Sequence, residues 1–68
     1  MKWTKTEREY WQHDYRTAGY HIEEQHQAFG TAYICYRVTN DHEVYMTRKS
    51  SLAAAKRFCA EHRKATAA

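Results

Sequence analysis

Proline is absent from the 68 residues, and glycine occurs only twice, at positions 19 and 30. The chain therefore has no flexible or proline-rich linker, and a single domain spanning residues 1–68 is expected. Large aliphatic side chains are also scarce, since Leu, Ile, Val and Phe total seven residues against ten Ala. A core this small gives a marginal stability and excludes a multidomain enzyme.

Long apolar runs are missing as well. No segment approaches the roughly 18 to 20 apolar residues of a membrane span, and the first residues lack the apolar stretch of a secretion signal. The two cysteines, Cys35 and Cys59, are too few for the disulfide framework of a small secreted protein. We therefore expect a cytoplasmic protein with reduced thiols and no membrane partner.

Aromatic residues are abundant by comparison. They make up 15% of the chain, and the net charge is only +3. This combination predicts a folded domain despite a mean hydropathy of −1.00. Charge is unevenly placed, because residues 1–47 carry five Lys or Arg and seven Asp or Glu, whereas residues 48–68 carry six and one. The C-terminal third is the basic end of the chain.

Apolar and polar residues alternate over residues 19–48, which is the pattern of antiparallel strands. A break at residues 26–30 separates the first strand from the second. Asn40 and Asp41 tolerate positive φ and predict a turn before a third strand. The sequence therefore predicts a small antiparallel sheet in this region.

The alternation also assigns the two faces of this sheet. The side chains expected to face the core are Ile22, Ile34, Tyr36, Val44 and Met46. The opposite parity presents a solvent-facing surface, whose candidate partner-binding residues are His21, Tyr33, Arg37 and Tyr45. Tyr and Arg are enriched at protein interfaces, although paired tyrosines also stabilise a sheet without any partner. Cys35 falls on this outer parity, which places it beyond disulfide reach of a cysteine in the core.

From Ser51 the hydrophobic period changes from 2 to 3.6 and predicts an amphipathic helix over residues 51–65. Stepping 100° per residue places Leu52, Phe58 and Cys59 on its core side. Ser50 or Ser51 is available as the N-cap. The fold class is therefore α+β, with a small antiparallel sheet of three to four strands packed against one C-terminal α-helix.

Residues 1–18 form an N-terminal segment that fits two interpretations. Thr4 with Glu7, and Thr6 with Glu9, match the capping box of a short helix. Residues 10–13 instead favour an extended strand that returns as a hairpin into the following sheet. Composition and spacing leave the choice between helix and strand open.

A set of motifs along the chain resembles small uncharacterised proteins encoded by phages and prophages. The motifs are Trp3-Thr4-x-Thr6, Trp11, Gly19-Tyr20-x-Ile22, Thr31-Ala32-Tyr33 and Ala55-Lys56-x-x-Cys59-x-x-His62. The resemblance covers most of the chain and implies a sheet closed by a C-terminal helix, with an extended stretch around Trp11 that favours four strands. It brings no established activity with it. The order of elements alone is also similar to β-β-β-α DNA-binding modules of the plant AP2 and integrase arm-binding types.

Cys59 and His62 are the residues most suggestive of chemistry, because positions three apart on a helix share a face and can ligate one zinc ion. Two ligands do not make a zinc site, and Cys35 is expected to point away from them. The sequence contains no nucleophile triad, phosphate-binding loop or dinucleotide-binding motif. We therefore expect no metal, no cofactor and no enzyme activity.

Two functional hypotheses follow. The first is a phage or mobile-element accessory protein that binds a host protein or nucleoprotein, as anti-CRISPR proteins and other small inhibitors of bacterial defence do. The alternative is a small nucleic-acid-binding module that contacts phosphates through its basic residues. The candidate phosphate-binding residues are Arg48, Lys49, Lys56, Arg57, Arg63 and Lys64.

Overall fold

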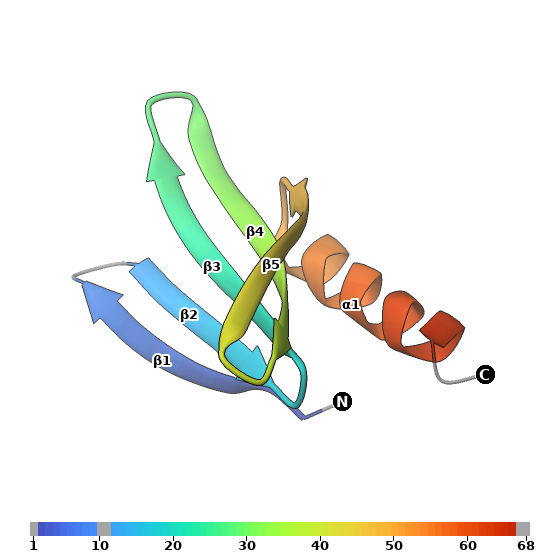
Figure 1. Ribbon diagram of the computed structural model, residues 1–68. Helices are drawn as coiled ribbons and strands as arrows, with labels where there is room; N and C mark the ends of the chain where they lie inside the picture. The colour runs from blue at the N-terminus through green and yellow to red at the C-terminus, as the bar shows by residue number, and fades with distance from the viewer. Residues whose placement is uncertain (1, 10–11, 67–68) are drawn as a thin grey trace.

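The computed structural model describes residues 2–9 and 12–66. Its elements are β1 (Thr4–Glu9), β2 (Gln12–Thr17), β3 (Tyr20–Gln27), β4 (Gly30–Thr39), β5 (His42–Lys49) and α1 (Leu52–Thr66). The five strands form one antiparallel sheet in the order β1-β2-β3-β4-β5, and α1 packs against β3, β4 and β5 (Figure 1). The predicted α+β class, a sheet with one C-terminal helix, is confirmed. The predicted number of strands, three to four, is wrong.

The additional strand comes from the N-terminal segment, which is extended on both sides of residues 10–11. β1 and β2 form an antiparallel pair in which Lys5 lies opposite Tyr15. Trp3, just before β1, packs against the core. A helix here would leave β3 with an unpaired edge, whereas the β1–β2 pair extends the ladder of backbone hydrogen bonds. Trp11, which contributes to the motif resemblance, lies outside the described residues.

The β3–β4 turn decides which side chains face the helix. Residues 28–29 form a two-residue turn, and the resulting register places Ile22 opposite Cys35. Residues directly opposite each other in an antiparallel pair share a face of the sheet. Cys35 therefore faces α1, while Ile34 and Tyr36 face away. The predicted faces for β4 are wrong. The predicted break had five residues, 26–30, whereas the turn has two, and an even number of turn residues gives the following strand the opposite facing from an odd number.

We call the side of the sheet that carries Ile22 and Cys35 the helix face, and the opposite side the outer face. The core lies between the helix face and α1 and consists of Tyr15, Tyr20, Ile22, Cys35, Ala55 and Cys59. The side chains packed around it are Trp3, Tyr33, Met46, Leu52 and Phe58. Val44, predicted to cover the core, is 54% exposed. The core is therefore built from aromatic rings and small side chains.

The helix α1 starts one residue after a serine cap. Ser51 Oγ accepts a hydrogen bond from the backbone N–H of Ala54 at 3.1 Å. Asn40, with φ of 43°, occupies the turn between β4 and β5, where positive φ was predicted.

Among the described residues, no helix is long and apolar enough to cross a membrane.

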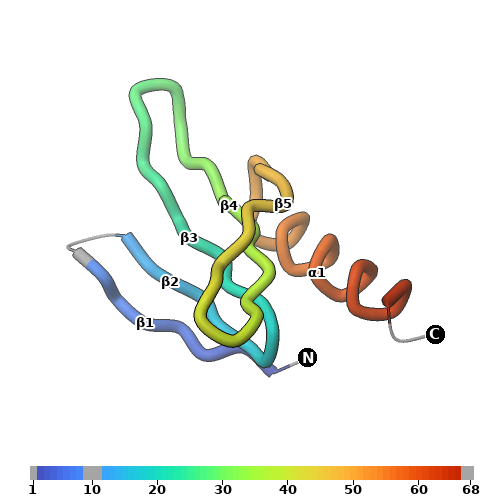
Figure 2. The backbone as a smooth tube through the Cα atoms, in the orientation of Figure 1, coloured from blue at the N-terminus to red at the C-terminus, as the bar shows by residue number. Residues whose placement is uncertain are grey.

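The β3–β4 hairpin extends beyond its neighbouring strands (Figure 2). β2 pairs with β3 only as far as Glu23, and β5 pairs with β4 only from Tyr33 onward. Residues 24–32 therefore form a hairpin end that is paired with neither flanking strand. Its turn lies far from α1 in both backbone views (Figures 1 and 2).

Candidate functional site

The structure separates the four residues predicted to form one partner-binding face. Tyr33 packs against the core on the helix face. The guanidinium carbon of Arg37 lies 5.4 Å from the ring centre of Tyr20, also on the helix face. The prediction that Tyr33 and Arg37 lie on the outer face is therefore wrong, and the physical reason is the two-residue β3–β4 turn.

His21 and Tyr45 do lie on the outer face, but their exposures differ. Tyr45 is 59% exposed, whereas His21 is only 5% exposed. His21 Nδ1 lies 2.5 Å from Glu43 Oε1, and its Nε2 lies 3.4 Å from Asp14 Oδ1. The His21 ring also stacks on Tyr36, with ring centres 5.5 Å apart. His21 thus connects β2, β3, β4 and β5 and is not available as a contact residue for a partner.

The six basic residues point in several directions. Arg48 is exposed and donates a hydrogen bond to Gln27 Oε1 at 2.7 Å. The Lys49 ammonium lies 5.4 Å from the ring centre of Phe58, on the side of α1. These two neighbours in sequence therefore present their charges on opposite sides of β5.

The helix carries the other four basic residues. The Lys56 ammonium lies 5.5 Å from the ring centre of Tyr15 and 6.0 Å from that of Trp3, so this side chain covers the edge of the core. The exposed basic residues of α1 are Arg57, Arg63 and Lys64. The basic end of the chain is therefore divided among the outer face, the core edge and the solvent side of the helix.

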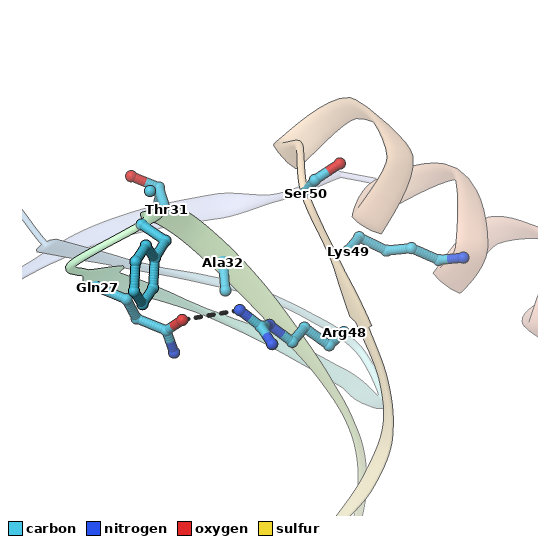
Figure 3. Close-up of a pocket in the computed structure, with 8 residues that line it drawn as sticks. Gln27, Thr31, Ala32, Arg48, Lys49 and Ser50 are labelled. Carbon is cyan, nitrogen blue, oxygen red and sulfur yellow. Dashed lines mark hydrogen bonds between the residues drawn. The ribbon is translucent and has the colours of Figure 1, made fainter.

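A depression of about 490 Å³ lies where the β3–β4 hairpin leaves β5. Its lining residues are Gln27, Phe29, Gly30, Thr31, Ala32, Arg48, Lys49 and Ser50. Figure 3 shows the Arg48 guanidinium reaching across it to the Gln27 amide, while Lys49 extends toward the helix. The depression is thus shaped by a hairpin end on one side and a cation on the other.

Phe29 is the most exposed large apolar side chain at this end of the molecule. Its exposed fraction is 103%, so the ring contributes nothing to the core. Arg48 forms no ion pair with any described side chain. We define the tip surface as Gln27, Phe29, Thr31 and Arg48. It combines an unburied aromatic ring with a cation that no carboxylate of the described chain neutralises.

A second polar cluster, which the sequence did not predict, lies on the helix face. His13 Nδ1 and His26 Nε2 lie 3.3 Å and 2.8 Å from the same oxygen, Glu24 Oε2. Burial raises the pKa of Glu24, but the hydrogen bonds and positive charge of His26 and His13 lower it more, and the net pKa is below its usual range. Within the described residues, no three His, Cys, Asp or Glu side chains are arranged to hold a metal ion.

The residues that suggested chemistry in the sequence are engaged inside the fold. His62 Nδ1 lies 2.8 Å from the Tyr20 hydroxyl, and the two rings meet edge to face. Cys35 and Cys59 are both fully buried. The expectation that these two cysteines lie on opposite sides of the sheet is wrong, because both belong to the core between β4 and α1.

Sequence reasoning missed Phe29, although the signal was present. An aromatic residue directly before Gly30, in the break between two alternating segments, lies at a hairpin turn and cannot reach the core. No protein-family model, curated protein or solved structure matches this chain.

Proposed function

We propose that this chain is a non-enzymatic accessory protein, of the phage type that its motifs resemble, and that it binds a host protein through the tip surface. The observation that carries the proposal is the fully exposed ring of Phe29 at the end of a projecting hairpin. The places of Cys35, Cys59 and His62 also support a binding role. These are the nucleophilic and basic side chains that an enzyme could use, and all three are engaged in the core or on its edge.

Phe29 can supply most of the binding energy of such a contact. An aromatic ring that enters a partner's pocket removes roughly 150–250 Å² from water, which at ~25 cal/mol/Å² is about 4–6 kcal/mol before the costs of association. The ring is presented at a tight turn between two paired strands, so little backbone freedom is lost on binding. These are the properties of an interface hot spot.

Arg48 defines the chemistry of the partner. Its guanidinium donates to a neutral amide and retains its charge, close to the hairpin that carries Phe29. A partner that fits the tip surface therefore presents an apolar pocket next to one or more carboxylates. A folded protein offers this combination, whereas a nucleic-acid backbone offers phosphates without the pocket. The division of the six basic residues among the outer face, the core edge and the solvent side of the helix also favours a protein over a nucleic acid.

Site-specific crosslinking tests the proposal. A photoreactive benzophenone amino acid is introduced at Phe29, and in a matched variant at Tyr45, which is also aromatic and exposed but lies on β5. Both proteins are irradiated in bacterial cells, and the lysates are divided and treated with or without nuclease. We expect one defined protein adduct from position 29, unchanged by nuclease, and no such adduct from position 45.

Three outcomes would contradict the proposal. Adducts that disappear with nuclease would identify a nucleic-acid partner. The same adduct from both positions would show that crosslinking from position 29 does not report binding at the tip surface. A defined adduct from position 45 alone would move the binding surface to β5.

A further inference from the structure

The two cysteines meet at the centre of the core, one from the sheet and one from the helix. Cys35 lies on β4 and Cys59 on α1, both have 0% exposure, and both belong to the same core cluster. Cys35 Sγ also lies 3.9 Å from the carbonyl oxygen of Ala55. In an α-helix that oxygen accepts the backbone N–H of the residue four positions later, which here is Cys59. Cys35 is therefore placed against the turn of α1 that carries Cys59.

We propose that Cys35 and Cys59 form a redox-active pair that closes to an intramolecular disulfide between β4 and α1 when a hydroperoxide reaches the core. A strand thiol that lies against the helix turn carrying a second buried thiol is the arrangement that a disulfide between two elements needs. The bond would fix the helix to the strand on which it packs.

Ionisation of one thiol starts the reaction, because the thiolate is the nucleophile. Burial opposes ionisation of both thiols in the closed structure, so it raises the pKa that each would otherwise have. Either cysteine can therefore attack once the core opens, and the other acts as the resolving thiol.

The chemistry balances with hydrogen peroxide as the oxidant. The first thiolate attacks one peroxide oxygen, the O–O bond breaks, and that cysteine becomes a sulfenic acid while hydroxide leaves. The sulfur of the second cysteine then attacks the sulfenic sulfur, the S–S bond forms and the S–O bond breaks, and the departing oxygen takes up protons as water. Two thiols lose two electrons and two hydrogens in total, and one peroxide is reduced to two water molecules.

Burial makes the reaction dependent on local opening. Because both sulfurs are inaccessible in the closed state, peroxide reaches them only when α1 separates from the sheet. The disulfide should therefore form slowly under native conditions and faster at a low denaturant concentration that leaves the protein folded. An exposed thiol pair would show no such acceleration.

The experiment treats the full chain with hydrogen peroxide and follows intact mass, thiol content after denaturation, and the thermal midpoint. We expect an intact mass lower by two hydrogens, no titratable thiol, no dimer, and one non-reduced peptide joining Cys35 to Cys59. The midpoint should rise by at least about 10 °C and return after dithiothreitol. Cys35→Ala and Cys59→Ala should each show no rise.

Several results would overturn the proposal. One is two free thiols after the peroxide is consumed, and another is independent gain of two or three oxygens at either cysteine. Disulfide-linked dimers would show that the pairing is between molecules. The proposal does not depend on the folding of the alanine variants, because mass and peptide mapping of the unsubstituted chain decide it.

Discussion

Replacing Ala55 by Leu perturbs the packing of α1 against the sheet. Ala55 has 0% exposure, and its carbonyl oxygen lies 3.9 Å from Cys35 Sγ on β4. Three additional carbon atoms at this position have no free space and must displace the helix or neighbouring side chains. Overpacking of this kind costs about 1–3 kcal/mol. For a chain of 68 residues the whole free energy of unfolding is roughly 3–10 kcal/mol, so the loss is a large fraction of it.

The matched control is Ala53→Leu, on the exposed side of the same helix turn. Both substitutions exchange one good helix former for another, so helix propensity contributes little to the difference. Urea unfolding followed by circular dichroism should give Ala53→Leu a free energy of unfolding within about 0.5 kcal/mol of the parent. The thermal midpoint of Ala55→Leu should fall by roughly 4–8 °C for each kcal/mol lost. Equal stability of the two variants would refute the assignment of Ala55 to the core-facing side of α1.

Two further predictions concern polar contacts in the core region. Glu24→Gln should lower the free energy of unfolding at neutral pH, because it removes the carboxylate beside His13 and His26. Since the pKa of Glu24 in the folded protein lies below its ordinary value of 4.5, this stabilisation is complete above pH 4.5 and is lost as the pH falls through the folded pKa. The free energies of unfolding of the two proteins should therefore converge as the pH falls below 4.5, and a constant difference would be inconsistent with this role. Tyr20→Phe removes the hydroxyl that lies 2.8 Å from His62 Nδ1 and should cost about 0.5–1.5 kcal/mol in thermal unfolding; an unchanged midpoint would show that this hydrogen bond does not stabilise the fold.

The sequence predicted the elements of the fold better than their orientation. Alternation located the strands that became β3, β4 and β5, and the change to a 3.6 period located α1, because both periods follow from backbone geometry. The facing of β4 depends instead on the number of residues in one turn. The predicted break of five residues is a turn of two, and this change from an odd to an even number reverses every side chain of the strand that follows. Nothing in the alternation of Ile34 and Tyr36 distinguishes these cases.

The N-terminal segment was ambiguous for a related reason. Capping-box pairs such as Thr4 and Glu7 are short-range signals that also fit an exposed edge strand, where Thr is favourable. Tertiary pairing with β3 decides between the two states, and that pairing is not encoded within residues 1–18.

The candidate site was also only partly accessible from sequence. The Tyr and Arg composition pointed to a binding surface, but Tyr33 and Arg37 changed faces with β4, and His21 was buried by two carboxylates. Exposure of Phe29 depends on the position of the turn rather than on residue type. A hydrophobic residue in the break between two predicted strands is therefore the main feature of the proposed binding surface.

The affinity of the captured host protein for Phe29→Ala tests the central functional claim most directly. The account predicts at least about 30-fold weaker binding, equivalent to about 2 kcal/mol, with the free energy of unfolding unchanged because the ring lies outside the core. A variant with Arg57, Arg63 and Lys64 changed to Gln should bind within about threefold of the parent, because these charges lie on α1, away from the tip surface (Figure 1). Full affinity of Phe29→Ala together with loss of binding by the helix variant would contradict the account and assign recognition to the basic helix.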